Sequence, residues 1–331
     1  MRRNTFALVA MLLLILSLAA CTGATPAATP PPAATAAETM ATPEMMATSE
    51  MMETPEMMEG GDLGTEENPI IMSFVPSGDT QEIIASGEEI AAMIQEKTGL
   101  VIEANVATSY AAVVEAMGAG NAQVGWLNTF SYILAAEKYN VEADLATVRR
   151  GSAFYTGQIV ANADSGIETL ADIDGKKMCW VDPLSTSGYI IPRVMLAAAG
   201  VDVDALETQD SGSHPNVITA VYNGDCDAGA SFVDARTAIA EEFPDVNDKV
   251  KVVAVSPEIP NDSVSFAPDL PAEAREQIVA ALLEIAQEEE GMAALAAVYE
   301  VDGFQEIDDS FYDGFRTELD AAGIDIEELA K

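Results

Sequence analysis

Short β-rich runs alternate with helical runs from residue 70 onward. This alternation limits the chain to α/β layers with largely parallel sheets, because parallel strands need a crossover between them. The predicted strands in the first part are 70–75, 101–106 and 124–127, and the predicted helices are 81–98, 110–117 and 129–138. The helix over 81–98 places its isoleucines on one face, which favours packing on a sheet.

A second α/β series follows a long predicted strand at 155–163, and the chain then returns through a strand at 263–266. We therefore predict two lobes, one of residues 69–158 plus 264–331 and one of residues 159–263. Two connecting strands, near 155–163 and 260–268, would form a hinge. Ligands of open α/β sheets bind beyond the carboxyl ends of strands, so we expect a ligand cleft between the lobes.

The N-terminus predicts export and lipid attachment. Arg2 and Arg3 precede an apolar stretch, 6–20, that is short of the roughly 20 residues a membrane span needs. We expect a signal peptide over 1–20. Leu18-Ala19-Ala20-Cys21 resembles the bacterial lipobox, which implies cleavage before Cys21, lipidation of its sulfur and an extracytoplasmic protein held to a bacterial membrane by lipid only. An ordinary signal peptide with a chance cysteine is the alternative.

Residues 21–68 predict a disordered tether after the lipidated cysteine. Residues 22–68 lack aromatic side chains and consist mostly of Ala, Thr, Pro, Met and Glu. Such a composition buries too little apolar surface to offset the entropy lost on ordering. Paired methionines recur here, and thioethers suit Cu(I), but no His or Cys lies among them to complete a metal site.

The formal net charge of −40 at pH 7 argues against nucleic acid and anionic headgroups as partners. Besides Cys21, the chain has Cys179 and Cys226, each at the start of a predicted strand. If those strands are parallel neighbours, a disulfide is geometrically allowed; two buried free thiols are the alternative. With a single histidine, we expect neither a zinc site nor a cofactor.

The segment Asp182–Gly188 follows a predicted strand and opens a predicted helix. Its hydroxyls, Ser185, Thr186 and Ser187, stand where a helix start leaves N–H groups free, so the segment can hold an anion without a full positive charge. A plain helix cap would need only one of them. His214 precedes Pro215, which predicts a second helix start on the same side of the same lobe.

These elements, taken together, resemble the phosphate/phosphite/phosphonate-binding subunits of ABC importers, which share a two-lobed periplasmic-binding-protein-like fold of type II. The matching elements follow in the family's order: 110–117, 124–126, 165–167, 185–189 and the His214 helix. The resemblance implies oxyanion contacts from Tyr110, Tyr155, Ser185, Thr186, Ser187 and His214. It also implies an acidic contact from Asp262 and a further one near Asp234, where Val233 matches as well.

The resemblance further implies a monomeric, non-enzymatic substrate-binding lipoprotein that delivers a small phosphorus oxyanion to an ABC permease with its ATPase. The predicted contact residues contain no Arg or Lys, so neutral donors would bind the anion. A carboxylate only accepts hydrogen bonds, so Asp262 would require a protonated oxygen or an ammonium and would exclude sulfate. Phosphate, phosphite and an organic phosphonate all remain open.

Two other classes of function remain. Ser187, His214 and Asp234 or Asp262 supply the residue types of a hydrolase triad, although the chain lacks a Gly-x-Ser-x-Gly motif. Alternatively, a receptor of the same fold would bind another small anion, such as a sulfonate, or report ligand status to a sensor.

Overall fold

The computed structural model describes residues 63–326, so the predicted signal peptide, Cys21 and most of the predicted tether lie outside the described residues. Residues 63–68, predicted as the end of the disordered tether, instead fold onto the first lobe. There, Val101 N donates to Gly64 O at 2.8 Å, and Leu63 packs against the core. These contacts give the segment buried surface and backbone partners, which its composition did not predict.

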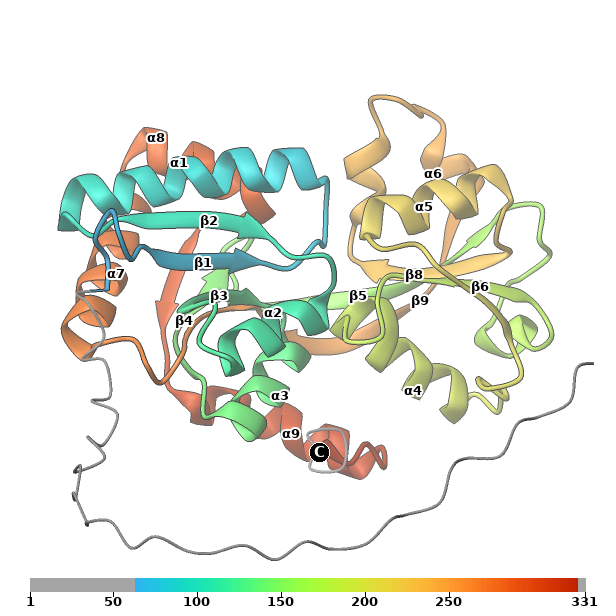
Figure 1. Cartoon of the computed structure of the whole chain (residues 1–331). Coiled ribbons are helices and arrows are strands. Elements are labelled where there is room, and N and C mark those ends of the chain that lie inside the picture. Colours follow the sequence, from blue (N-terminus) through green and yellow to red (C-terminus); the bar gives the residue numbers. More distant parts are fainter. Residues whose placement is uncertain (1–62, 327–331) are drawn as a thin grey trace, which may run out of the picture. The chain divides into compact units, whose positions relative to one another are not determined.

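The first lobe is built on a mixed sheet (Figure 1). Its strand order is β11 (Gly303–Glu306), β4 (Glu142–Val148), β10 (Ser263–Phe266), β3 (Val124–Leu127), β1 (Ile70–Phe74) and β2 (Ile102–Val106). β1 pairs in parallel with β2 and β3, whereas β10 pairs antiparallel with β3 and β4. The parallel half thus matches the alternation in the sequence, and the returning chain supplies the antiparallel half.

The second lobe has its own mixed sheet. Its order is β7 (Glu207–Asp210), β6 (Lys177–Trp180), β8 (Ala228–Phe232), β5 (Phe154–Asn162) and β9 (Val250–Pro260). β6 pairs in parallel with β7 and β8, and β5 pairs antiparallel with β8 and β9. The α/β architecture predicted from the alternation is therefore confirmed in both sheets. The prediction that the sheets are largely parallel is wrong, because β4, β5, β9, β10 and β11 pair antiparallel with their neighbours.

Helices cover both faces of each sheet (Figure 1). On the first sheet, one face carries α1 (Thr80–Thr98), α7 (Ala272–Ile285) and α8 (Glu289–Tyr299), and the other side carries α2 (Tyr110–Gly118), α3 (Thr129–Tyr139) and α9 (Asp313–Ala321). On the second, α5 (His214–Asn223) and α6 (Val246–Lys249) face α4 (Ile191–Ala198) across the sheet. The short helices are η1 (Leu170–Ile173), η2 (Thr186–Ile190), η3 (Ala235–Ile239) and η4 (Asp309–Tyr312).

The chain crosses between the sheets at 149–153, after β4, and at 261–262, after β9. The first crossing precedes the predicted hinge strand at 155–163, because those residues are already paired with β8 and β9 in the second sheet. Asn261 joins the two crossings: its N–H donates to Ala153 O at 2.8 Å, and its side-chain Nδ2 donates to Ser152 O at 3.1 Å. The predicted lobe boundary at 158/159 falls inside β5, and the one at 263/264 falls at the start of β10.

Cys179 in β6 and Cys226 just before β8 form a disulfide, with their Cα atoms 5.8 Å apart. Their strands are parallel neighbours, which is the arrangement that makes the bond geometrically allowed. The bond links the sheet of the second lobe to the turn that follows α5.

Trp126 and Phe130 are buried in the first lobe. Trp126 stacks on Phe74 with ring centroids 5.3 Å apart.

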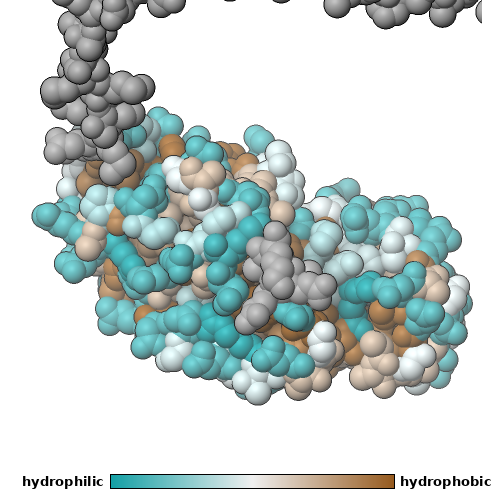
Figure 2. Space-filling model, turned by 60° about the horizontal axis from the view of Figure 1, so that its bottom comes forward, coloured by the Kyte–Doolittle hydropathy of each residue, from teal (hydrophilic) through white to brown (hydrophobic). Residues whose placement is uncertain are grey.

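On the face shown in Figure 2, hydrophilic residues predominate and hydrophobic residues occupy smaller areas. None of the helices within residues 63–326 is both long and apolar enough to cross a membrane.

Candidate functional site

The segment after β6 turns sharply into η2. Asp182 Oδ1 accepts from Leu184 N at 2.8 Å, and Ser185 Oγ accepts from Gly188 N at 3.1 Å, so Ser185 caps the helical turn. A Cβ at Gly188 would lie 2.4 Å from Val181, so only glycine allows this close packing. The turn η2 is a π-helix that leads into α4.

Thr186 joins the two lobes. Its Oγ1 accepts from Asn128 Nδ2 at 2.8 Å and from Phe130 N at 3.0 Å. Asn128 is the N-cap of α3 but makes no side-chain capping bond there. Thr186, from the second lobe, therefore supplies the missing acceptor for a helix of the first lobe. Among residues 63–326, the Thr186 hydroxyl has no recorded acceptor for its own proton, so it can donate to a ligand.

Ser187 and Tyr155 lie together at the start of the second sheet. A Cβ at Gly157 of β5 would lie 3.1 Å from Ser187 Cβ, so the glycine lets η2 rest directly on this strand. Burial raises the pKa of the Tyr155 hydroxyl, as does the charge of Asp262, while the nearby hydroxyls of Ser187 and Thr186 oppose the change. Tyr155 therefore stays a neutral donor close to both hydroxyls.

Tyr110 begins α2, and its backbone N–H donates to Asp182 Oδ2 of the second lobe at 3.3 Å. Its side chain is 1% exposed, and within the described residues its hydroxyl has no hydrogen-bond partner. Burial raises its pKa well above the ordinary range, and neighbouring Ser185 opposes this only partly. A buried, neutral, unpartnered O–H is costly unless another group satisfies it.

His214 opens α5, as predicted, with Pro215 in the first turn. Its backbone N–H donates to Ser77 O of the first lobe at 3.1 Å, and its ring Nδ1 accepts from Phe232 N at 3.3 Å. Burial, with a contribution from the positive charge of Arg149, lowers the pKa of His214 to about 3. The ring is therefore neutral near pH 7, and because Nδ1 accepts, its proton resides on Nε2.

Asp262 lies in the second crossing and forms an ion pair with Arg149 of the first, Nη2 to Oδ2 at 2.7 Å. Its negative charge contributes to raising the pKa values of Tyr110 and Tyr155, so it lies among the predicted contacts. Arg149 was not predicted, since the predicted contact residues contained no Arg or Lys. The structure places its guanidinium next to Asp262, one of those residues.

Asp234 is bound to another partner. Its carboxylate pairs with Arg236, Nη2 to Oδ2 at 2.5 Å, and also accepts from Gln158 Nε2 at 3.2 Å. It caps η3, and none of its hydrogen bonds within residues 63–326 involves another predicted contact residue. The structure therefore brings six of the eight predicted side chains into mutual contact or electrostatic reach. His214 is within electrostatic reach of Arg149, and Asp234 is engaged with Arg236.

Sequence reasoning missed Arg149, Asn128 and Tyr299. The backbone oxygen of Tyr299 accepts from Arg149 Nε at 2.7 Å. Burial and the charge of Asp262 both raise the pKa of the Tyr299 hydroxyl. One signal was available: Arg149 and Arg150 are adjacent in a chain with 15 basic and 55 acidic residues. Across the described residues, no group of three or more His, Cys, Asp or Glu side chains could hold a metal ion.

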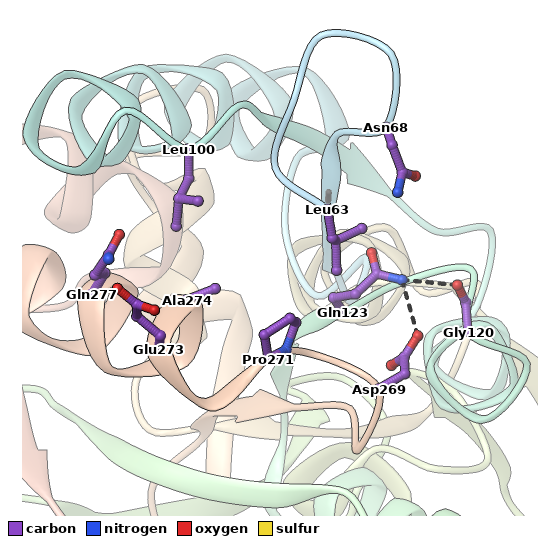
Figure 3. Close-up of a pocket in the computed structure, with 10 residues that line it drawn as sticks. All are labelled: Leu63, Asn68, Leu100, Gly120, Gln123, Asp269, Pro271, Glu273, Ala274 and Gln277. Atoms are coloured by element: carbon purple, nitrogen blue, oxygen red, sulfur yellow. Dashed lines mark hydrogen bonds between the residues drawn. The ribbon is translucent and has the colours of Figure 1, made fainter. Parts of the chain in front are cut away.

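A separate surface pocket of about 530 Å³ lies on the first lobe between the start of α7 and the loop before β3 (Figure 3). Gln123, which lines it, donates to Gly120 O at 2.8 Å and to Asp269 at 3.5 Å. Asp269 and Glu273 give this pocket acidic walls. No predicted contact residue lines it, and its charge disfavours an anion.

The fold is that of the two-lobed periplasmic binding proteins. One similar solved structure is the binding protein component of an ABC phosphonate transporter from Pseudomonas aeruginosa, with a TM-score of 0.68, 24% identity and coverage of 75% of this chain and 84% of that one. Another is PhnD1 from Prochlorococcus marinus in complex with methylphosphonate, with a TM-score of 0.69, 15% identity and coverage of 77% and 98%.

The family follows from the sequence. Residues 72–312 match the family described as ABC transporter, phosphonate, periplasmic substrate-binding protein, and the chain belongs to this family. It is 34% identical over 175 residues to the phosphate-import protein PhnD of Mycolicibacterium smegmatis, covering 49% of this chain and 54% of that protein. It is 24% identical over 191 residues to the phosphonates-binding periplasmic protein of Escherichia coli, covering 56% of each. These matches span about half the length of either relative.

Proposed function

We propose that the chain captures a small phosphorus oxyanion between its lobes and delivers it to an ABC permease with its ATPase. The contacts would come from Tyr110, Tyr155, the hydroxyls of 185–187, His214 and Asp262. Membership of the substrate-binding family supports this role. The relatives named for phosphate import and phosphonate binding support the class of cargo. The protein would act as a monomer and do no chemistry on the anion.

The buried Tyr110 hydroxyl is the observation that carries the proposal. It has no partner among the described residues, and Ser185 lies close by. A phosphorus oxyanion at this point would accept from this hydroxyl. Neutral His214, with its proton on Nε2, and the Ser187 hydroxyl are further uncharged donors in the same lobe interface. Fixed neutral donors in a dry site bind an anion strongly because the local dielectric constant is low.

The same contacts weigh against a hydrolase. A triad needs an Asp that accepts from His Nδ1–H, so that the ring can take the serine proton at Nε2. Here His214 Nδ1 accepts from a backbone N–H instead. The two candidate carboxylates, Asp234 and Asp262, are paired with Arg236 and Arg149. We therefore expect no covalent capture of a fluorophosphonate probe by Ser187.

Calorimetric titration of the purified protein tests the cargo. Phosphate, phosphite, methylphosphonate and sulfate would each be titrated at pH 7. We expect at least one phosphorus anion to bind with a Kd at or below about 1 μM, corresponding to roughly 8 kcal/mol, and sulfate to bind far more weakly. Absence of binding for all three phosphorus anions would contradict the proposal.

We also propose that lipid on Cys21 holds the protein to the outer side of a bacterial membrane, with residues 22–62 as spacer. The support is the basic, apolar and small-residue order of the first 21 residues. Cells fed a palmitate analogue should incorporate the label into the wild-type protein and not into Cys21→Ala. Equal labelling of both proteins would rule out this attachment site.

A further inference from the structure

Arg149 holds three acceptors at once. Its Nη2 donates to Asp262 Oδ2 at 2.7 Å, its Nη1 to Asn261 Oδ1 at 3.2 Å and its Nε to Tyr299 O at 2.7 Å. A guanidinium offers donors in a fixed planar fork, whereas an ammonium does not. These bonds therefore set both the position and the orientation of the positive charge.

The contacts of Arg149 join the two crossings between the lobes. Arg149 follows β4 in the first crossing, and Asn261 and Asp262 form the second. The side chains of Arg149 and Asp262 are 19% and 15% exposed, so the ion pair is largely removed from water. Breaking such a pair by deleting one partner leaves an uncompensated charge in a poorly solvated place.

Asp262 faces the predicted ligand contacts. Its charge contributes to raising the pKa values of four buried tyrosine hydroxyls, those of Tyr110, Tyr155, Tyr299 and Tyr312. Arg149 binds Oδ2, and no hydrogen bond within residues 63–326 engages Oδ1. Oδ1 is therefore the oxygen that can accept from a ligand.

We propose that Arg149 is a positioning residue that binds Oδ2 of Asp262, orients Oδ1 as an acceptor for the ligand, and thereby sets the preference of the site for oxyanions that carry a proton. The inference rests on the proposed function and adds to it the residue that enforces the selectivity. Arg149 acts through Asp262 and does not itself have to touch the anion.

The physical reason lies in the orientation of the carboxylate. A carboxylate only accepts hydrogen bonds, so it favours a P–OH and repels the bare oxygens of sulfate. Without Arg149, the carboxylate of Asp262 would lose the donor that fixes Oδ2, and Oδ1 would no longer be held toward the hydroxyl of a ligand. Because the ion pair is neutral overall, it does not repel the cargo.

Arg149→Gln tests the proposal. Affinities for sulfate and for whichever of phosphate, phosphite and methylphosphonate binds the wild type most tightly would be measured at pH 7. A site that hydrogen-bonds a ligand hydroxyl can reject an analogue without it by about 10⁴-fold. We expect the ratio of the two affinities to fall by about 100-fold or more in the variant. A merely structural loss would weaken both anions alike.

Arg150→Gln is the matched control. Arg150 is the adjacent arginine, is largely exposed, and bonds to Val233 O and Glu300 rather than to Asp262. Its removal should leave the ratio of affinities unchanged. Arg149→Lys retains a charge that can pair with Asp262 but lacks the planar fork, so it should restore only a minor part of the ratio lost in Arg149→Gln.

Asp262→Asn provides a second test, which also holds if Arg149→Gln does not fold. An amide can donate as well as accept, so the ratio should fall in this variant too. A wild-type ratio in either folded variant would overturn the role of Arg149 while leaving the proposed function intact. A wild type that binds none of the three phosphorus anions would instead overturn the proposed function.

Discussion

At the scale of single residues, some polar side chains of the site already have hydrogen-bond partners within the protein, and others do not. Thr186 and His214 use part of their hydrogen-bonding capacity within the protein. The hydroxyl of Tyr110 uses none within the described residues. This difference predicts opposite effects on stability and on binding.

Replacing Tyr110 with Phe should leave the free energy of unfolding of the ligand-free protein unchanged or raise it by up to about 1 kcal/mol, because a buried unpaired hydroxyl is removed. The same change should weaken binding of a phosphorus anion by about 1.5–3 kcal/mol, the range for a hydrogen bond to a charged group. Urea unfolding and calorimetric titration measure the two effects. Tyr132→Phe is the control: its hydroxyl donates to Asp309 at 2.6 Å, so its loss should destabilise the fold and leave affinity unchanged.

Protonation of His214 should lower the free energy of unfolding as the pH falls. Its folded pKa is about 3, against an ordinary value of 6.5, so between these values the unfolded chain binds a proton that the folded protein does not. Stability should therefore fall as the pH drops through this window, by about 2 kcal/mol between pH 7 and pH 5. His214→Asn keeps an acceptor for Phe232 N and should reduce the pH dependence by that amount in urea unfolding. Because His214 is the sole histidine, equal pH dependence in both proteins would contradict the assignment.

The sequence predicts where Ser185 and His214 lie because a local rule, the helix start, fixes each of them. It does not predict the partner of Asp262, since Arg149 lies 113 residues away and only the fold brings them together. Asp234 is the opposite case: its partner, Arg236, is only two residues away, so this ion pair could have been predicted from the sequence and was missed. Local chemistry is readable from the chain, whereas long-range pairing of charges is not.

At the scale of elements, the best predictions are two short strands of the first sheet. The predicted strands at 124–127 and 263–266 have the same bounds as β3 and β10. Residues 142–148 were not predicted, because Glu142 and Asp144 weaken the β pattern and the strand depends on β10 and β11, more than 100 residues away. The predicted helix from Gly188 begins earlier, at Thr186, as a π-helix.

Pro192 explains the π-helix. It has no N–H, so the carbonyl of Gly188, four residues earlier, lacks its usual helical donor. Val181 N donates to this carbonyl instead, at 3.3 Å. This hydrogen bond ties the π-helix to the residue that follows β6, and so holds Ser185, Thr186 and Ser187 next to the second sheet.

The disulfide should stabilise the second lobe. It closes a loop with a sequence separation of 47 residues, which contains η2, α4, β7 and α5. Loop-closure entropy predicts a loss of about 3–4 kcal/mol in the free energy of unfolding for the double variant Cys179→Ser, Cys226→Ser. Urea unfolding would measure it, with reduced wild type as a second comparison. A loss below about 1 kcal/mol would argue against this contribution.

At the scale of the whole molecule, three helix starts make contacts across the lobes. Asp182 of the second lobe accepts from the first turn of α2, Thr186 accepts from that of α3, and His214 N donates to Ser77 O of the first lobe. Asn128 adds bonds to Leu184 O and Thr186 Oγ1, both at 2.8 Å. The lobes are therefore joined by hydrogen bonds at these points.

Asn128→Ala should shift the ligand-free protein toward a more open arrangement, because it removes two bonds between the lobes and leaves their acceptors without that donor. Small-angle scattering should show a larger radius of gyration, and anion affinity should fall by about tenfold. Asn162→Ala is the matched control, since its amide bonds to Val221 O at 2.7 Å within the second lobe. It should lower stability without changing the radius of gyration.

Because Thr186 caps a helix that belongs to the other half of the protein, the two halves cannot diverge independently at this point. A chimera that combined the first lobe of this chain with the second lobe of a relative would need a hydroxyl at the position of Thr186 and an amide at that of Asn128. Exchange of either residue alone would remove hydrogen bonds between Thr186 and the start of α3. Recombination among such importers should therefore preserve this pair as a unit, even where the surrounding sequence changes freely.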